Sequence, residues 1–378
     1  MRTIPFNRVE HQFNEIDYIK RVLMNGHISG DGEFTVLCNE LIEKELGVKK
    51  VFLTTSCTHA LEMAAMLLDI KLGDEIIIPS FTFVSTVNAF VLRGATPIFI
   101  DIRPDTLNMD EKLLEGLITK KTKAIVPVHY AGVGCEMDMI VDIANNYKIP
   151  LVEDNAHGLF GKYKGKNLGT FGYFATQSFH ATKNFTCGEG GALLINDESY
   201  VERAEIIREK GTNRAQMFRG EVDKYSWVDI GSSYLPSDIL AAHLYSQLEN
   251  RDTIQHRRKI IWGRYQNELS SWANKYQIGL PIIPDHCQQA YHLFYLIMPS
   301  LEARTAMMNY LASHGISSAF HYLPLNTSKY GKIQSSKNNS CPVTEDLSNR
   351  LIRLPFFNSL DEVSQNKVIQ CILSYRID

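Results

Sequence analysis

The chain has 378 residues, of which 44% are hydrophobic and 10% aromatic, and its 39 Lys and Arg against 42 Asp and Glu give a formal charge of −3. This composition excludes a disordered chain, because a sequence of this length can bury roughly three quarters of its unfolded surface. The balanced charge, without a long run of like charges, argues against a nucleic-acid or membrane partner. We expect one large α/β domain and a smaller one.

The seven cysteines stand singly, without the spacing that brings two thiolates to one metal ion. We therefore expect free thiols in a reducing compartment. Residues 1–6 are not followed by an apolar stretch long enough for a signal peptide or a membrane span, which favours a cytoplasmic protein. His129, His180 and His321 lack companion ligands at metal spacing, so no metal site is expected.

The first half of the chain repeats a pattern of short apolar strand, polar turn and helix. Residues 51–53 predict a strand, and the polar turn 54–59 leads into strong helix formers at 60–68. Further strands are predicted at residues 75–79, 96–101, 124–128 and 150–154. Short apolar strands separated by crossover helices predict a mostly parallel central sheet with helices on both faces.

Residues 173–179 and 192–197 predict two more strands, which can pair as a hairpin. Helical composition over residues 237–267 predicts one long connecting helix. Beyond it, residues 290–298, 316–323 and the last thirty or so supply a small α+β domain, and the polar stretch 328–340 predicts an exposed loop. We place a large α/β domain at residues 1–255 and a small C-terminal domain at 256–378.

Four polar segments follow predicted strands, at the sheet edge where open α/β proteins bind ligands: residues 56–59, 80–83, 154–157 and 178–183. The first is either a simple helix cap or an anion site. Asp154 is either a turn carboxylate or the partner of a cationic ring nitrogen. Lys183 is either a solvated lysine or a Schiff-base nucleophile in a partly desolvated cleft. Together with an aromatic platform, these features match the needs of pyridoxal phosphate.

Seven stretches, in order, resemble the DegT/DnrJ family of sugar aminotransferases, which are fold-type I pyridoxal-phosphate enzymes. These stretches are residues 30–32, 56–61, 79–86, 128–132, 152–158, 178–184 and 188–191. Residues 208–214 and 229–234 are most similar to the branch of the family that makes dTDP-4-amino-4,6-dideoxygalactose. The resemblance spans nearly the whole chain and implies the α/β fold already expected, with an active site shared between two subunits of a homodimer.

The resemblance also implies the role of each site residue. Lys183 is the catalytic residue, which binds the cofactor covalently and moves the proton of the donor. Asp154 pairs with the pyridine nitrogen and Phe83 stacks on the ring. His157 is implied to lie near the ring hydroxyl. The phosphate is implied to be held by the hydroxyls of Thr58 and Ser178 and by the backbone of Cys57, Thr58 and His59. Ser233 of the neighbouring subunit is implied to complete the phosphate site, in place of the family's usual Asn.

The implied reaction moves the amino group of L-glutamate to C4 of a dTDP-linked 4-keto-6-deoxyhexose, with the galacto product favoured. Amination at C3 and a gluco-configured C4 product remain alternatives, and a non-catalytic sugar-nucleotide-binding regulator is a more remote one. His321 and Tyr322 are implied to line the substrate entrance. Arg214 and Arg219 form a basic group that is either a solvated surface or a contact for the substrate diphosphate.

Overall fold

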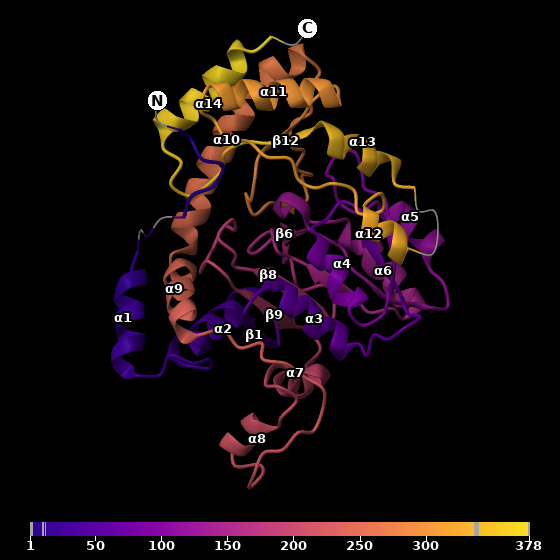
Figure 1. Ribbon diagram of the computed structural model, residues 1–378, viewed down its shortest axis with the longest axis vertical. Coiled ribbons are helices and arrows are strands. Elements are labelled where there is room, and N and C mark those ends of the chain that lie inside the picture. Colours follow the sequence, from indigo (N-terminus) through magenta and orange to yellow (C-terminus); the bar gives the residue numbers. More distant parts are fainter. Residues whose placement is uncertain (1–2, 10, 12, 336–339, 377–378) are drawn as a thin grey trace.

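A central sheet organises the larger part of the computed structural model, which describes residues 3–9, 11, 13–335 and 340–376 (Figure 1). A four-stranded sheet and a three-stranded sheet join through the parallel bridges Ile125–Leu151 and Val128–Asp154, which gives the order β1-β9-β8-β5-β4-β2-β3. Only β9 in this order runs antiparallel to its neighbours. The strands are β1 (Lys50–Thr54), β2 (Glu75–Pro79), β3 (Thr96–Ile100), β4 (Thr122–Ile125), β5 (Val152–Asp154), β8 (Phe174–Ser178) and β9 (Gly191–Ile195).

Helices cover both faces of this sheet, because successive strand residues point to opposite sides and both sets are apolar. Phe52 of β1 packs with one set of helices, and Val51 and Leu53 pack with the other. The first set is α3 (Cys57–Leu67), α4 (Val84–Val91) and α7 (Val201–Arg208). The second is α1 (Glu15–Asn25), α2 (Glu33–Leu46) and α9 (Asp238–Glu249), with α5 (Glu111–Leu117) and α6 (Met137–Tyr147) over the other half of the sheet. The predicted α/β architecture and the β8–β9 hairpin are confirmed.

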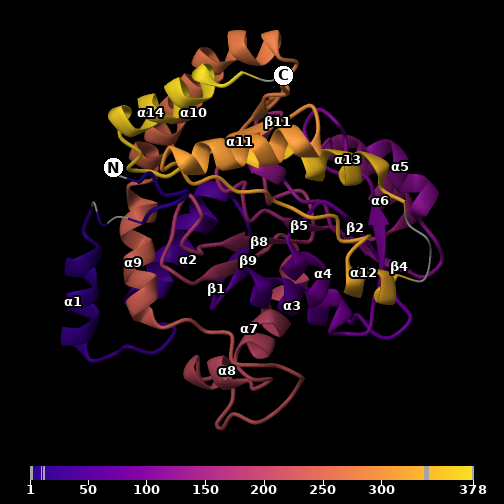
Figure 2. The ribbon, with the colours of Figure 1, turned by 45° about the horizontal axis from the view of Figure 1, so that its top comes forward.

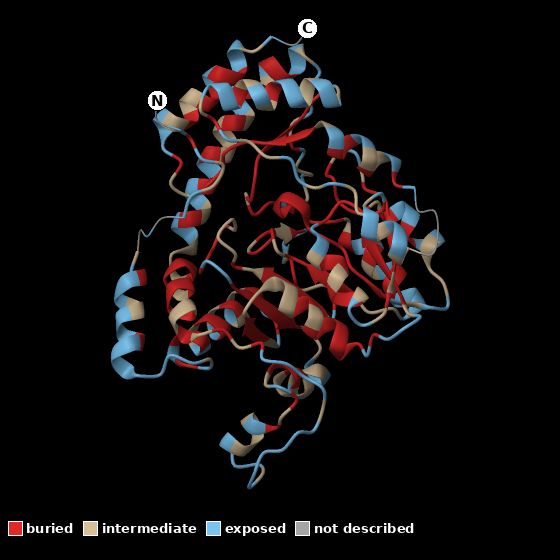
Figure 3. Cartoon of the chain, in the orientation of Figure 1, coloured by how far each residue is buried: buried red, intermediate tan, exposed pale blue. Residues whose placement is uncertain are grey.

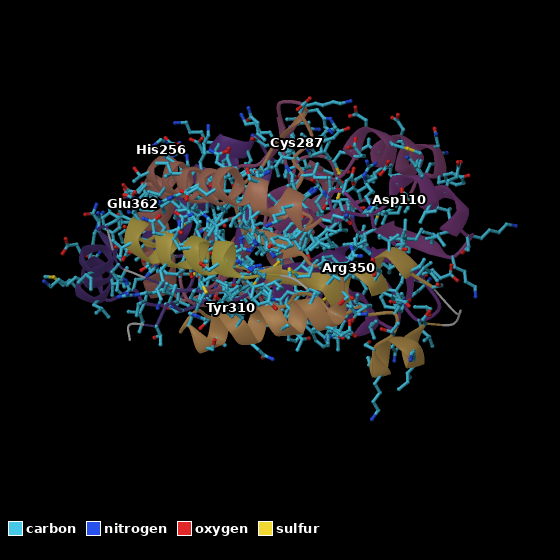
Figure 4. The ribbon with its side chains drawn as sticks, turned by 90° about the horizontal axis from the view of Figure 1, so that it is seen from above. Asp110, His256, Cys287, Tyr310, Arg350 and Glu362 are labelled. Carbon is cyan, nitrogen blue, oxygen red and sulfur yellow. The ribbon has the colours of Figure 1, made fainter. Side chains whose placement is uncertain are left out.

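The C-terminal part forms a second core above the sheet (Figure 2). The antiparallel strands β11 (Tyr295–Ile297) and β12 (Leu351–Arg353) pack with α10 (Arg251–Lys275), α11 (Leu301–Ser313) and α14 (Glu362–Ser374), and Ile4 joins them from the N-terminal segment. Seen from above, α14 lies between α10 and α11, where side chains fill the space (Figure 4). The domain division at residue 255 stays a prediction and falls within α10.

Two predicted elements are corrected by the structure. The single helix over 237–267 is wrong, because Asn250 leaves helical geometry and its Nδ2 donates to the Ser246 carbonyl, which ends α9 before α10 begins. The loop over 328–340 is wrong in part, because Ser328 caps the short helix α12 (Lys329–Gln334) by accepting from the Gly331 amide at 3.1 Å. Residues 336–339 of that loop lie outside the described residues.

Beyond α7, an extension formed by α8 (Arg214–Phe218) and the chain that follows projects away from the body (Figure 1), and Figure 3 shows that much of its surface is exposed. The remaining short elements are β6 (Lys162–Tyr163), β7 (Lys166–Asn167), β10 (Cys287–Gln288) and α13 (Pro342–Arg350). All seven cysteines are unpaired thiols. In the part of the chain that the structure describes, no helix has the length and apolar character to cross a bilayer.

Candidate active site

The strand ends of the central sheet open into a cavity of about 440 Å³. At the end of β1, the Ser56 side chain caps α3 by accepting from the His59 amide at 3.1 Å. Ser56, Cys57 and Thr58 line this cavity at the first turn of α3, where free backbone N–H groups and the helix dipole favour an anion. Ser178, at the end of β8, lines the same cavity.

Asp154 ends β5 inside the cavity and is only 5% exposed. One carboxylate oxygen accepts from Thr86 Oγ1 at 2.7 Å, and the other accepts from the Ala156 amide at 3.1 Å. Thr86 Oγ1 lies 2.9 Å from Thr82 Oγ1, which fixes its orientation. These hydrogen bonds hold the carboxylate in one orientation, as a partner for a ring nitrogen requires.

Lys183 lies in the loop that follows β8. The Phe179 amide donates to the Gly190 carbonyl and the Ala181 amide to the Gly188 carbonyl, both at 2.8 Å, so the hairpin continues past the strands and holds the loop in place. The Lys183 side chain lines the cavity. Desolvation, with a smaller contribution from the charge of Arg353, lowers the pKa of Lys183 to about 8, although Cys57 and Asp154 act to raise it. A neutral amine is therefore accessible near physiological pH.

Aromatic and imidazole rings form another wall of the cavity. Phe83 is 56% exposed although it lines the cavity, and its ring lies beside that of Tyr322, with centroids 6.1 Å apart. It therefore presents an apolar surface to the cavity. His157 stacks on His292 with ring centroids 4.0 Å apart, and Tyr322 Oη lies 3.3 Å from His157 Nε2. Burial holds the pKa of His157 and of His292 well below the usual range, so both rings are neutral at physiological pH.

Pyridoxal phosphate fits these residues. The first turn of α3 is open to the phosphate, and Gly191 packs so closely behind it that a Cβ there would lie 2.3 Å from the Cys57 nitrogen. His157 Nδ1 is buried and has no hydrogen-bond partner among the described atoms, so this nitrogen is available to hydrogen-bond a ligand. Phosphate turn, aromatic face, carboxylate and amine share one cavity, as the sequence predicted.

The structure brings most of the predicted site residues together, and three of them lie elsewhere in the protomer. Cys57, Thr58, Phe83, Asp154, His157, Ser178, Lys183, His321 and Tyr322 all line the cavity. His59, predicted at the phosphate through its backbone, lies in the first turn of α3, while its ring faces Tyr234, with centroids 5.1 Å apart, and hydrogen-bonds to Thr55. Arg214, Arg219 and Ser233 are exposed on the projecting extension, where Arg214 pairs with Glu209 and Arg219 with Glu205 and Glu221.

Sequence reasoning missed three residues of this site. Thr86 positions Asp154, His292 stacks on His157, and Arg353 brings a guanidinium to the cavity wall from β12. Thr86 lies within a stretch that the sequence already marked, on the first turn of α4, where its hydroxyl reaches Asp154 at the end of β5. His292 and Arg353 come from the C-terminal part of the chain, and their local sequence carries no comparable signal.

The low pKa of Lys183 predicts how fast the cofactor-free protein takes up pyridoxal phosphate. Only the neutral amine attacks the aldehyde, so the rate should rise about tenfold per pH unit below about 8 and level off above it, because the deprotonated form then dominates. Stopped-flow absorbance across this pH range measures the rate. A rate that keeps rising to the ordinary lysine pKa of about 10.4 would show a solvated amine.

Comparison with known proteins agrees with this site. The model of the DegT/DnrJ/EryC1/StrS aminotransferase family matches residues 10–373. An uncharacterised protein of Methanocaldococcus jannaschii is 34% identical over 348 residues, which cover 90% of this chain and 89% of that protein. The pyridoxamine-phosphate form of the putative sugar aminotransferase Spr1654 from Streptococcus pneumoniae is 28% identical, with a TM-score of 0.91 over 99% of this chain and 97% of that chain. The Helicobacter pylori aminotransferase PseC, involved in pseudoaminic acid biosynthesis, is 26% identical, with a TM-score of 0.89 over 98% of each chain.

The family match extends over nearly the whole chain, and it includes every residue that lines the phosphate turn, the carboxylate and the lysine. Spr1654 has been solved in both the pyridoxal-phosphate and the pyridoxamine-phosphate forms, the two states between which such an enzyme alternates. The chain therefore belongs to the DegT/DnrJ/EryC1/StrS aminotransferase family and is a fold-type I aminotransferase that uses pyridoxal phosphate.

Proposed function

We propose that the enzyme transfers the amino group of L-glutamate to C4 of a nucleotide-linked 4-keto-6-deoxyhexose, dTDP-4-keto-6-deoxyglucose, and that it gives the galacto-configured amino sugar. Glutamate leaves as 2-oxoglutarate, and the amino group replaces the keto oxygen of the sugar. The observation that carries the proposal is the lysine amine that shares one cavity with a buried carboxylate and an open helix N-terminus. The sugar acceptor is supported by the relatives Spr1654, a putative sugar aminotransferase, and PseC, an aminotransferase involved in pseudoaminic acid biosynthesis.

Separate residues of this chain would bind the cofactor and transfer the proton of the donor. When bound, pyridoxal phosphate supplies an electron-withdrawing ring that stabilises negative charge on the carbon that carries the amino group. Asp154 holds the proton on the ring nitrogen, and the first turn of α3 with Thr58 and Ser178 holds the phosphate. Lys183 Nζ, once released and neutral, takes the proton from Cα of glutamate and delivers it to C4′ of the cofactor. In this proposal His157, whose Nε2 lies 3.3 Å from Tyr322 Oη, hydrogen-bonds the ring hydroxyl.

We assign the extension to contact with a second subunit of a homodimer. It exposes large apolar side chains, with Trp227 81% and Phe218 69% exposed, and apolar side chains gathered on one extension are typical of a contact surface. In this assignment Ser233 completes the phosphate site of the partner, and Arg214 and Arg219 lie toward the diphosphate of the sugar nucleotide. Both guanidinium groups are about half exposed and pair with glutamates in the protomer, so a diphosphate would have to replace these ion pairs.

The product of the reaction tests the proposal. We expect incubation with dTDP-4-keto-6-deoxyglucose and L-glutamate to yield a 4-amino sugar whose C4 configuration, read from proton couplings by NMR, is galacto. An amino group at C3 would contradict the proposed position of amination, and a gluco configuration at C4 would contradict the proposed stereochemistry. Both results would still be those of an aminotransferase. A protein that stays colourless with pyridoxal phosphate would favour the non-catalytic regulator instead.

A further inference from the structure

Asn184, the residue that follows Lys183, ties the lysine loop to the stretch of chain before β11. Asn184 is only 5% exposed. Its Nδ2 donates to the Ala290 carbonyl at 2.6 Å, and its Oδ1 lies 2.8 Å from His292 Nδ1. Because Nδ2 is bound to a carbonyl, Oδ1 is the amide atom left for His292, and an amide oxygen can only accept a hydrogen bond. His292 therefore carries its proton on Nδ1.

His292 is a neutral ring that lies flat against His157. The two ring centroids are 4.0 Å apart, the planes differ by 20°, and both residues line the active-site cavity. The titratable and charged groups that face His292 are His157, Lys183, Arg353 and Arg258. Burial, with the positive charges of these groups, holds the pKa of His292 well below its usual range. The stack therefore consists of two uncharged imidazole rings at physiological pH.

The stack leaves His157 with one ring nitrogen for a ligand. Tyr322 Oη lies 3.3 Å from Nε2, whereas Nδ1 is buried and has no partner among the described atoms. The backbone is held as closely as the ring. A Cβ on Gly132 would lie 2.7 Å from the His157 carbonyl oxygen and 2.9 Å from the Ala290 Cβ, so His157 and the residue that anchors Asn184 pack on the same glycine. The direction of Nδ1 is thus fixed from several sides.

His157 and Lys183 would meet adjacent positions of the cofactor. In pyridoxal phosphate the hydroxyl is attached to the ring carbon next to the one that carries the aldehyde, and the aldehyde is the group that Lys183 attacks. A ring that is held at both positions has a defined orientation in the cavity. Asn184 is the chain neighbour of Lys183 and is linked through His292 to His157. One hydrogen-bonded and stacked unit therefore reaches both positions.

We propose that Asn184 and His292 are positioning residues, which hold His157 Nδ1 toward the ring hydroxyl of the cofactor and in register with Lys183. Asn184 sets the tautomer and the orientation of His292, and His292 supplies the flat, uncharged face against which His157 lies. Both act through His157 and not on the reacting atoms. This inference rests on the proposed place of His157 at the ring hydroxyl, and it does not depend on the sugar acceptor.

Nitrogen NMR of the full-length wild-type protein with isotopically labelled histidine tests the tautomer. We expect His292 to be neutral at physiological pH with its proton on Nδ1, both before and after pyridoxal phosphate is added. The spectrum of His292→Phe assigns the signal. A proton on Nε2, or a doubly protonated ring, would overturn the proposal. This result requires no variant to bind the cofactor or to turn over.

The pH titration of the visible cofactor band in the holoenzyme tests the positioning. A hydrogen bond from His157 Nδ1 stabilises negative charge on the hydroxyl oxygen, so its loss makes the bound cofactor hold its proton more tightly and moves the titration midpoint to higher pH. For His157→Phe the shift should be about one pH unit, as expected for one hydrogen bond to a charged group. Asn184→Leu and His292→Leu should each produce at least half of this shift. Neither should add to His157→Phe, because all three act through the same nitrogen.

His243→Phe is the matched control for a general disturbance of the lysine loop. His243 is also a buried histidine, and its Nδ1 lies 2.9 Å from the Thr186 carbonyl oxygen in that loop, but it does not line the cavity. The titration midpoint of this variant should equal that of the wild type. A shift as large as that of His292→Leu would show that any loosening of the loop moves the midpoint, and it would overturn the positioning role.

The titrations distinguish failure of this inference from failure of the proposed function. No shift in His157→Phe would contradict the proposed place of His157 at the ring hydroxyl. A shift in His157→Phe without one in Asn184→Leu or His292→Leu would overturn the positioning role alone. Shifts that add to that of His157→Phe would show that Asn184 and His292 act independently of His157, which also overturns it.

Discussion

Replacing Lys183 with alanine is expected to abolish turnover, by at least about 10⁴-fold, and to remove the visible absorption band of the covalently bound cofactor. The variant loses both the nucleophile and the group that moves the proton, and proton transfer alone contributes up to about 10⁴-fold. Cofactor absorbance and single-turnover kinetics with L-glutamate measure the two losses separately. The fold should persist, because removing a partly buried amine of lowered pKa relieves a desolvation cost.

Two further variants make this result specific. Lys71→Ala removes an exposed lysine far from the cavity and should retain the band and the rate. Adding a small primary amine to Lys183→Ala should restore part of the proton transfer, since the cavity left by the side chain can admit it. A Lys183→Ala protein that kept both the band and turnover would show that another amine performs the chemistry.

The sequence predicted the strand ends of the site because burial on both faces of the sheet makes each strand a short apolar run. Phe52 and its neighbours in β1 are all buried, so the first polar residues after them mark the edge of the sheet. The same holds for Asp154, which follows a buried strand. Residues that are adjacent to strand ends meet at one edge by topology alone, and that is why the separate polar turns could be assigned to one cavity.

Arg353 and His292 could not be predicted in this way, because they reach the cavity through tertiary packing. Arg353 stands in the apolar run Leu351-Ile352-Arg353-Leu354-Pro355, where a charged residue suggests only the exposed side of a strand. His292 precedes β11 in a stretch without a motif. Their positions depend on how the C-terminal core packs against the sheet, and no local pattern encodes that arrangement.

The break between α9 and α10 shows a different limit. Both helices have helical composition, and a single polar residue between them decides whether the chain continues. The Asn250 side chain donates to the Ser246 carbonyl and so competes with the backbone hydrogen bonds of a continuous helix. A composition averaged over many residues does not reveal this competition. The roles of Ser233, Arg214 and Arg219 depend in turn on a second subunit, so they stay predictions.

Replacing Asp154 with asparagine is expected to lower the rate of the glutamate half-reaction about 10³-fold while the cofactor still binds through Lys183. Asparagine fills the same space but carries no charge, so it cannot hold the proton on the ring nitrogen, and the ring loses its capacity to stabilise negative charge. Breaking a buried charge pair costs about 3–5 kcal/mol, and each 1.36 kcal/mol is tenfold in rate. Rapid mixing of the holoenzyme with L-glutamate measures the rate, and cofactor absorbance confirms occupancy.

Removing the hydrogen bond from Thr86 to Asp154 should have a smaller effect than removing the charge of Asp154. Thr86→Val removes one donor to the carboxylate at 2.7 Å but leaves its charge in place, so the rate should fall only about tenfold, in line with the roughly 1.5 kcal/mol of a hydrogen bond to a charged group. Asp138→Asn, which removes an exposed carboxylate paired with Lys164, should have no effect. If Thr86→Val were slower than Asp154→Asn, the charge of the carboxylate would matter less than the hydroxyl that orients it. Either that result, or an Asp154→Asn enzyme as fast as wild type, would show that Asp154 is not the partner of the ring nitrogen.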